Sequence, residues 1–302
     1  MTLDRLKLGI AASAFGDDFR SAAQRARTLG FDGLQFDAYS PSLNLPDLSG
    51  SGRREFLRLL SAQDRQLIGL RYDVGPRGFG PGADVDQALD RLARVMELAA
   101  ALGCPLVCVE AGPLPAQRRT SEPKPTITSD QLGLLVLSKS PASDISPQEI
   151  PAPPIDPAVY SSTDSALAEL GARADRYSVV VAFRSEMSSF AAIERALKSA
   201  NCPWFGLDLD PADVLRDEWP MDEIFSRFGP LIRHVRGRDA AVGGDRRTKP
   251  MPIGSGNTDW GALLANLASA DYHGWLTIDP IALNDRIAAA ELGRKRLLEI
   301  VK

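Results

Sequence analysis

Three features of the sequence predict an α/β protein built as a single (β/α)8 barrel, or TIM barrel. Short apolar runs alternate with longer amphipathic segments eight times along the chain. The length of 302 residues suits eight such units in one domain over residues 1–302. No Gly-x-Gly-x-x-Gly motif follows the first run, which disfavours the alternative, an open doubly wound sheet.

The apolar runs are typical of parallel strands buried on both faces. Each is short, rich in Val, Ile, Leu and Phe, and lies near Gly or Pro. The predicted strands span residues 6–12, 33–39, 66–73, 105–111, 178–184, 204–210, 231–237 and 275–281.

Helix signals occupy the segments between these runs. Asp17 or Asp18 can cap the first helix, an apolar stripe starts at Phe19, and Gly30 can end it. Similar patterns span residues 83–103, 189–200, 258–270 and 281–301.

Residues 113–160 interrupt the alternation and predict a Pro-rich insertion after the fourth strand. Ten of the 22 Pro residues lie within 113–157, around an apolar run at 132–137. This run either packs on the outside of the barrel or forms a lid or a contact within a homo-oligomer. The second alternative arises because the loop leaves the end of the barrel where active sites lie.

Composition excludes several classes of protein. A net charge of −4 argues against a nucleic-acid partner. The chain has no stretch of about 18 apolar residues that could span a membrane, and its start lacks the pattern of a secretory signal. The three Cys residues suggest reduced thiols, so we expect a cytoplasmic protein.

Polar and charged residues end most of the predicted strands, which is where barrel enzymes place their active sites. These residues are Gln35, Asp37, Arg71, Asp73, Glu110, Arg184, Glu186, Asp208, Asp210, His234, Arg236 and Asp279. Alternation along the strands predicts that four of them face inward together: Arg184, Asp210, Arg236 and Asp279.

The sequence also resembles the xylose-isomerase-like barrels, the sugar phosphate isomerase/epimerase group. The segment 251–279 resembles the family's Pro-x-Gly-x-Gly, aromatic-led helix, Gly-Tyr-x-Gly and final strand ending in an acid. LGFDGLQF at 29–36, DPAD at 210–213 and HVRGRD at 234–239 resemble three further family motifs. The resemblance covers nearly the whole chain outside 113–160 and implies isomerase, epimerase or lyase activity on a sugar-like substrate.

The resemblance also implies a divalent metal held by Glu, Asp, His and Glu from the last four strands. The matching residues in this sequence are Arg184, Asp210, Arg236 and Asp279, and Asp213 replaces a family His. A guanidinium group has no lone pair for a metal and stays protonated near neutral pH. We therefore expect no metal cofactor, and we expect the two Arg residues to pair with the two Asp residues in the place of the metal.

The remaining candidate site residues have more than one possible role. Glu110, Glu186 and His234 are candidate acids or bases, although His234 also suits a structural role in the barrel wall. The cluster of Arg71, Arg184, Arg236 and Arg238 suits a carboxylate or phosphate ligand, or each Arg neutralises a nearby Asp. The backbone of Gly254–Gly256 is a weak candidate for binding phosphate.

Two functions remain open. The first is a divergent isomerase, epimerase or lyase that acts on a sugar-like or anionic small molecule, with Arg replacing the metal. The second is a non-catalytic barrel that binds such a ligand or a protein partner. A metal-dependent endonuclease with this fold needs many His residues, and the chain has two.

Overall fold

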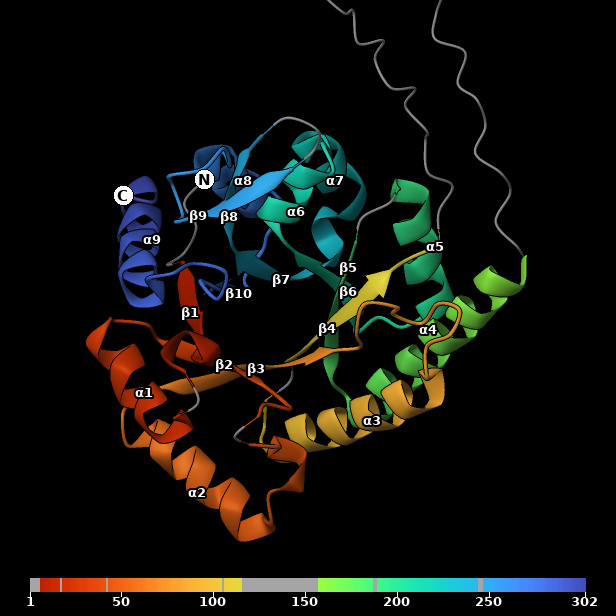
Figure 1. The fold of residues 1–302 in the computed structure, drawn as a ribbon, viewed down its shortest axis with the longest axis horizontal. Helices are drawn as coiled ribbons and strands as arrows, with labels where there is room; N and C mark the ends of the chain where they lie inside the picture. Colours follow the sequence, from red (N-terminus) through yellow and green to blue (C-terminus); the bar gives the residue numbers. More distant parts are fainter. Residues whose placement is uncertain are drawn as a thin grey trace, which may run out of the picture.

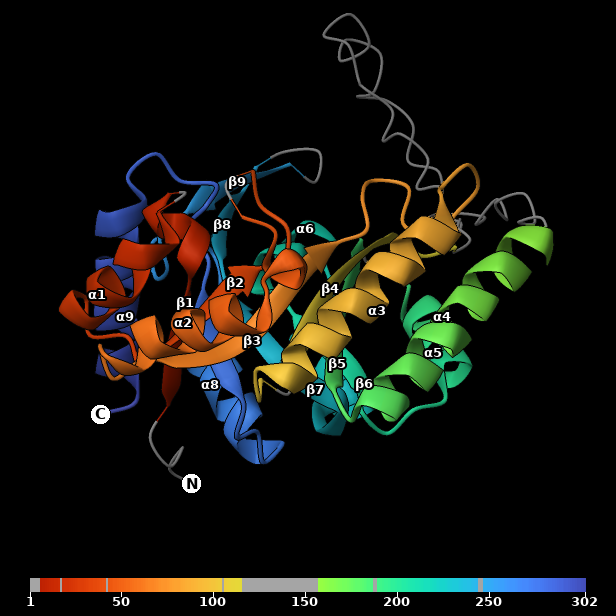
Figure 2. The ribbon, with the colours of Figure 1, turned by 90° about the horizontal axis from the view of Figure 1, so that it is seen from below.

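Eight parallel strands close into a barrel with helices around the outside (Figures 1 and 2). The computed structural model describes residues 6–16, 18–41, 43–104, 106–115, 157–186, 189–243 and 247–302. The barrel strands follow the order β1-β10-β7-β6-β5-β4-β3-β2, and pairing of β1 with β2 closes the ring. They are β1 (Lys7–Ala11), β2 (Gly33–Asp37), β3 (Gln66–Asp73), β4 (Leu106–Pro113), β5 (Val180–Glu186), β6 (Phe205–Leu209), β7 (Ile232–Gly237) and β10 (Trp275–Ile278). The predicted (β/α)8 barrel is confirmed.

Helices follow the strands and cover the barrel. The α-helices are α1 (Phe19–Thr28), α2 (Gly50–Ser61), α3 (Val85–Ala101), α4 (Pro157–Tyr177), α5 (Phe190–Ala200), α6 (Pro211–Arg216), α7 (Met221–Phe228), α8 (Trp260–Ser269) and α9 (Arg286–Ile300). Short 3-10 helices are η1 (Ala12–Phe15), η2 (Leu45–Asp47) and η4 (Gly229–Leu231). Figure 2 shows α3, α4 and α5 side by side, and α4 contacts both neighbours.

Most helices begin at a side chain that accepts a hydrogen bond from the first turn. Asp18 caps α1 by accepting from the backbone N–H of Arg20 at 3.1 Å, as one of the two predicted caps. Asp210 caps the short helix α6 in the same way, with its Oδ1 3.0 Å from the backbone N of Ala212. This cap fixes one carboxylate oxygen of Asp210 directly at the carboxyl end of β6.

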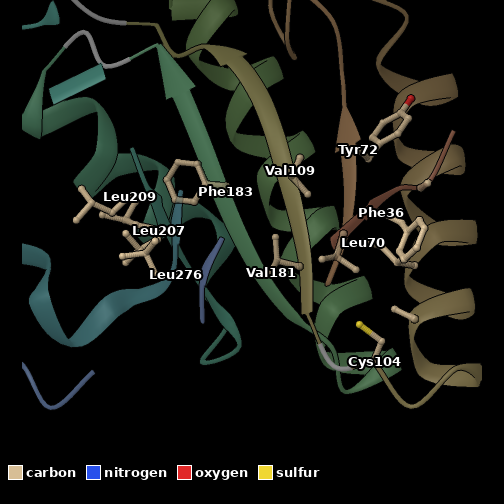
Figure 3. Close-up of a cluster of buried hydrophobic side chains, with 14 of the residues drawn as sticks. Phe36, Leu70, Tyr72, Cys104, Val109, Val181, Phe183, Leu207, Leu209 and Leu276 are labelled. Atoms are coloured by element: carbon tan, nitrogen blue, oxygen red, sulfur yellow. The ribbon is translucent and has the colours of Figure 1, made fainter. Parts of the chain in front are cut away.

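The main apolar core lies between the barrel wall and the helices. Alternate strand residues point outward into it, among them Val109, Val181, Phe183, Leu207 and Leu276 (Figure 3). Phe183 stacks on Phe205, with ring centroids 4.9 Å apart. The buried strands and the apolar helix faces thus form one continuous layer that holds the strand ends in place.

Inside the barrel, polar side chains lie beneath the strand ends, together with a small apolar cluster of Leu106, Cys108 and Ala182. His234 of β7 has both ring nitrogens bonded, with Nδ1 2.6 Å from Asp208 Oδ1 and Nε2 2.7 Å from Thr277 Oγ1. Across the barrel, the side-chain amide of Gln35 donates to Cys108 Sγ at 3.1 Å. Side chains from strands that are not neighbours can meet only inside the closed ring. These buried polar groups satisfy one another, which is the condition for low cost in a core.

A two-stranded antiparallel hairpin, β8 (Asp239–Val242) and β9 (Thr248–Met251), follows β7 and was not predicted. The carboxylate of Asp239 anchors it by accepting from the backbone N–H groups of Gly254, Gly256 and Thr258 at 2.9, 3.1 and 3.2 Å. The same carboxylate also accepts hydrogen bonds from the backbone N–H of Ala240 and from the indole N–H of Trp260. Gly256 is required here because a Cβ would lie 2.3 Å from the Asp239 carboxylate.

Most of the predicted insertion at 113–160 lies outside the described residues, which resume at Pro157 in α4. Its proposed lid and subunit contacts therefore stay predictions. Among the helices that are described, none combines the length and apolar character needed to cross a bilayer. Cys104, Cys108 and Cys202 are all unpaired, as expected for reduced thiols.

Candidate functional site

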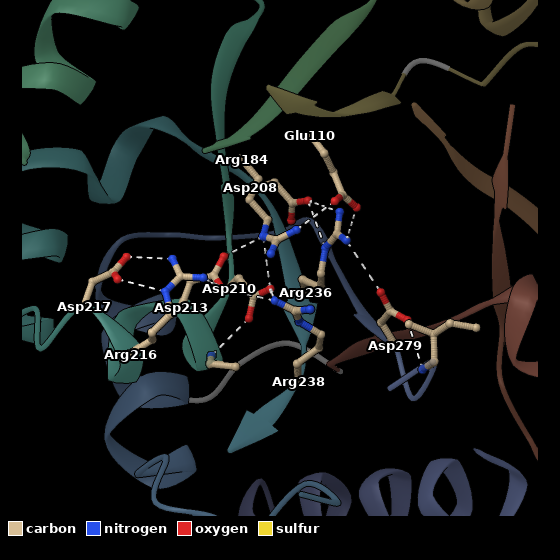
Figure 4. Close-up of polar contacts among 12 residues, drawn as sticks. Glu110, Arg184, Asp208, Asp210, Asp213, Arg216, Asp217, Arg236, Arg238 and Asp279 are labelled. Carbon is tan, nitrogen blue, oxygen red and sulfur yellow. Dashed lines mark hydrogen bonds and ion pairs between the residues drawn. The ribbon is translucent and has the colours of Figure 1, made fainter. Parts of the chain in front are cut away.

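A network of Arg, Asp and Glu side chains occupies the carboxyl ends of the barrel strands (Figure 4). Because every barrel strand is parallel to its neighbours, these ends meet at one rim, as the sequence predicted. The network contains Asp37, Arg71, Glu110, Arg184, Asp208, Asp210, Asp213, Arg216, Asp217, Arg236, Arg238 and Asp279. It therefore includes all six residues that were predicted to bind ligand.

Arg236 of β7 lies at the floor of the network and is only 2% exposed. Its Nη1 is 2.6 Å from Glu110 Oε1, its Nη2 is 2.8 Å from Asp208 Oδ2, and its Nη1 is 3.5 Å from Asp279 Oδ2. Burial opposes the charge, but these carboxylates, Asp208 foremost, hold the pKa of Arg236 above its usual value. The guanidinium group is thus a fixed positive charge on the barrel axis.

Arg71 of β3 continues this floor toward β2. Its Nε is 2.5 Å from Asp37 Oδ1, and its Nη1 is 2.8 Å from Asp279 Oδ2. Burial opposes the positive charge of Arg71, but Asp279 and Asp37 keep its pKa raised. Asp279 therefore bridges the two guanidinium groups of Arg71 and Arg236. Burial would raise the pKa of Asp279, but these two Arg residues lower it.

Arg184 of β5 and Arg238, which follows β7, hold a second pair of carboxylates. The Nε of Arg184 is 2.6 Å from Asp213 Oδ2 and 3.3 Å from Asp210 Oδ2. Arg238 pairs with the same Asp210 oxygen and lies 3.2 Å from Asp213 Oδ1. Burial and the neighbouring Asp213 charge raise the pKa of Asp210, whereas the guanidinium of Arg184 overcomes burial and lowers that of Asp213.

Glu110 of β4 joins the two halves of the network. Its two oxygens accept separately, Oε1 from Arg236 at 2.6 Å and Oε2 from Arg184 at 3.0 Å. Burial would raise the pKa of Glu110, but the charges of Arg236, Arg184 and Arg71 lower it below its usual value. Glu110 is consequently ionised at neutral pH and is a weaker base than an unpaired carboxylate.

The other two candidate acids or bases are placed differently. His234 is fully buried one strand layer below Arg236, with both nitrogens bonded, so its catalytic role stays a prediction that burial disfavours. Glu186 ends β5, and its side chain lies outside the described part of the chain.

Two residues of the network, Arg216 and Asp217, were missed by the sequence reasoning. Arg216 lies one helical turn after Asp213, 3.1 Å from it, a spacing that could have revealed the pair.

The residues at the four expected metal positions do not fit a divalent cation. The structure brings Arg184 beside Asp210 and Arg236 beside Asp279, so guanidinium groups stand where two ligands would be needed. A sealed triad below them, Cys108, Asp208 and His234, has ligand atoms within 4.8 Å of one another. Its Asp208 oxygens already accept from His234 and Arg236, and the other ring nitrogen of His234 bonds to Thr277, so a cation there would have to displace existing hydrogen bonds.

The expected phosphate site at Gly254–Gly256 is not available for that role. The backbone N–H groups of Gly254 and Gly256 donate to the Asp239 carboxylate, and that of Ser255 donates to the carbonyl of Pro252 at 2.9 Å. The chain's own carboxylate takes the place of an external anion. The glycine pattern therefore marks a structural turn.

Two cavities adjoin the network on either side of the loop after β10. One of about 210 Å³ lies beside Arg184, Arg238 and the hairpin. The other, of about 260 Å³, lies next to Asp37 and is lined also by Phe19, Phe36 and Ser40. Both cavities are lined by a mixture of apolar and polar side chains, and the first is also lined by several charged groups of the network.

Comparison with known proteins establishes the family of this chain. The family described as xylose isomerase-like TIM barrel matches residues 23–300, and the chain belongs to that family. No protein of curated function matches the sequence. The family assignment confirms the resemblance seen in the sequence.

Solved structures with the same fold include enzymes of sugar metabolism. A xylose isomerase-like TIM barrel protein from Mycobacterium smegmatis, in complex with magnesium, has a TM-score of 0.70 and 14% identity over 100% of this chain and 98% of that one. The 3-keto-D-glucoside 4-epimerase of E. coli has a TM-score of 0.67 and 17% identity over 98% and 100% of the two chains. D-Psicose 3-epimerase from Clostridium cellulolyticum, with D-tagatose, has a TM-score of 0.68 and 14% identity over 98% and 100%. At these identities the likeness concerns the fold.

Proposed function

We propose that the protein binds or acts on a small sugar-like or anionic metabolite at the strand ends, without the divalent metal of its family. The observation that supports this is the position of Arg184 and Arg236 at two of the four expected ligand positions. Each is held by carboxylates at 2.6 Å, so neither side chain can swing away without leaving a buried charge unpaired.

The guanidinium pair takes over the electrostatic role of a metal. A Glu, Asp, His and Glu set carries three negative charges and needs a cation, whereas Arg184, Asp210, Arg236 and Asp279 balance one another. Preorganised guanidinium groups can stabilise an oxyanion that develops on a substrate, as metals do. The protein supplies this positive charge from its own residues.

Isomerisation or epimerisation of a hydroxy-carbonyl compound requires removal of a proton next to the carbonyl. Glu110 is the candidate base that contacts both guanidinium groups, and Glu186 and His234 remain the other two candidates. In this scheme the partly exposed Arg184 contacts the enediolate, and the buried charge of Arg236 stabilises it at longer range. Arg71, Arg238, Asp210 and Asp279 position the ligand and these two Arg residues.

The second candidate function is a non-catalytic barrel that binds the same class of ligand. The lowered pKa of Glu110 beside Arg236, Arg184 and Arg71 favours it, because a strongly paired carboxylate abstracts protons poorly. The unpaired Cys104, Cys108 and Cys202 support a cytoplasmic location for either function.

Elemental mass spectrometry of the purified protein tests the metal-free proposal. After dialysis against trace Mn²⁺, Mg²⁺ and Zn²⁺, we expect well below one ion per chain.

Calorimetric titration with D-gluconate and D-fructose tests the ligand class. We expect the protein to bind at least one of the two, with an affinity that EDTA does not change. About one tightly held ion per chain, or binding that EDTA abolishes, would refute the proposal.

A further inference from the structure

The cavity beside the hairpin has walls from four separate parts of the chain. Helix α6 and the end of β7 form one side, β8 and β9 form the roof, and the loop after β10 with the first turns of α9 closes the other side. Figure 1 shows the hairpin and α6 next to each other above the barrel. The volume of about 210 Å³ is below the range of about 300–1,000 Å³ for drug-sized ligands, so it suits a small metabolite.

One wall of the cavity presents hydrogen-bond donors. The side chains of Arg184, Arg216 and Arg238 are 17, 32 and 22% exposed. The carboxylates among the lining residues are covered, since Asp213 is 5%, Asp239 is 3% and Asp279 is 4% exposed. A ligand in the cavity therefore meets N–H groups, and it meets few carboxylate oxygens. This arrangement favours an acceptor group with negative charge.

The opposite wall is apolar. Met251 and Ile253 come from the hairpin side, Ile278 from β10, and Leu283 from the loop before α9. No aromatic residue occurs among the described lining residues. The hydroxyl groups of a sugar chain would lose water against these aliphatic side chains and find no hydrogen-bond partner there. The wall instead suits a hydrocarbon body.

The cavity is held in shape before a ligand enters. Asp239 fixes the hairpin to the 254–258 turn through N–H donors from Gly254, Gly256 and Thr258. Arg216 is bound by both oxygens of Asp217, at 2.9 and 2.8 Å. A preorganised pocket loses little freedom when it binds, which lets a small ligand bind measurably.

From these walls we infer that the cavity binds a small branched-chain carboxylic acid. Its carboxylate lies on the edges of Arg184 and Arg238, and its apolar chain lies against Met251, Ile278 and Leu283. The inference rests on the proposed function only in placing an anionic ligand at this end of the barrel. It differs from that proposal in the chemistry of the ligand, which is an aliphatic acid and carries no polyol chain.

Calorimetric titration with isovalerate tests the inference, with isovaleramide as the uncharged analogue. Isovalerate is expected to bind, and isovaleramide to bind about tenfold more weakly or worse, because it forfeits the charge-assisted bonds. Arg238→Gln should weaken isovalerate binding by a similar factor. Leu283→Asp should also weaken isovalerate binding, because it places a negative charge in the apolar wall against which the ligand's chain lies. Leu283 is half-buried, so folding tolerates the change.

Arg227→Gln is the matched control, because Arg227 pairs on the surface with Glu194 and Glu223 and does not line the cavity. It should leave isovalerate binding unchanged. Absence of isovalerate binding, or binding that neither Arg238→Gln nor Leu283→Asp weakens, would overturn the inference. If D-gluconate binds in that case, the proposed function survives alone. If isovalerate binds and neither D-gluconate nor D-fructose does, the inference stands and the sugar-like part of the proposal falls.

Discussion

Asp239, which follows β7, and Asp208, near the end of β6, are both buried carboxylates, but their partners differ. Asp239 accepts hydrogen bonds from neutral donors, mainly backbone N–H groups whose positions the turn fixes. Asp208 is held by Arg236 and His234, whose side chains also contact Glu110, Asp279 and Thr277. The first arrangement stabilises one loop, whereas the second links four strands through charges.

This difference distinguishes a carboxylate with a structural role from a network that can bind a ligand. A carboxylate saturated by backbone groups has nothing to offer a ligand, and the glycine-rich turn around Asp239 is consequently structural. In the strand-end network, the guanidinium groups of Arg184 and Arg238 keep partly exposed edges, while Asp210 and Asp213, the two carboxylates that they share, are covered. Ligand binding is therefore expected where the Arg residues have remaining donors.

Removal of the central guanidinium should have the largest effect on stability. Arg236→Met leaves Glu110, Asp208 and Asp279 without their shared partner in a buried site. We expect a loss of about 3–5 kcal/mol in the free energy of unfolding, measured by urea denaturation. Arg58→Met is the control, because Arg58 and Glu55 form an exposed pair, and it should change the free energy of unfolding far less than Arg236→Met. Equal effects of the two substitutions would show that the network is not linked through Arg236.

Substitution of the hairpin anchor should have a smaller but clear effect. Asp239→Asn places an amide N–H₂ among donors from Gly254, Gly256 and Thr258, so some of them lose their acceptor. The expected loss is about 2–4 kcal/mol in the free energy of unfolding. Asp64→Asn, at a side chain that is 97% exposed, should stay within about 0.5 kcal/mol. A loss below 1 kcal/mol for Asp239→Asn would contradict the structural role assigned to this carboxylate.

The pH dependence of stability should have opposite signs with and without Arg236. In the native protein burial would raise the pKa values of Asp208, Glu110 and Asp279, but Arg236 lowers all three, together with His234 at Asp208, Arg184 at Glu110 and Arg71 at Asp279. Their contribution is present above the unfolded pKa values near 4 and is lost as the pH falls through the lower folded values. In Arg236→Met these carboxylates are buried without that charge, so their folded pKa values should rise.

Stability of Arg236→Met should then increase as the pH falls from 7 toward 5, because folding takes up protons. The free energy of unfolding of the native protein should be nearly constant over that range and should fall below about pH 4. Urea denaturation at a series of pH values measures both curves. Parallel curves would mean that Arg236 does not control these carboxylates.

Local patterns were sufficient for the barrel and for most of the site. Each strand forms a compact apolar run, and parallel strands that close into a barrel place their ends together, so the convergence of Arg184, Asp210, Arg236 and Asp279 could be foreseen. The hairpin could not, because β9 reads Thr-Lys-Pro-Met and is neither apolar nor alternating. Its stability comes from Asp239, whose partners lie 15 to 19 residues away in sequence for the three turn amides.

The sequence also could not predict which side chains pair with each other within the network. Glu110 was expected to be a base, but its contacts with Arg236 and Arg184 depend on side-chain directions across the barrel. His234 was placed in the barrel wall or at the site. In the structure it lies inside, on the same side of β7 as Arg236 but one layer lower, where Thr277 and Asp208 satisfy it.

Titration of Mn²⁺ into the Arg184→Glu/Arg236→His double variant tests most directly whether guanidinium groups replace a metal here. Arg184→Gln/Arg236→Gln is the control, because it removes both charges without supplying metal ligands. We predict that the native protein and the control bind Mn²⁺ weakly or not at all, and that the Glu/His variant binds about one ion per chain at least tenfold more tightly. Tight Mn²⁺ binding by the native protein, or no gain in the Glu/His variant over the control, would contradict the account.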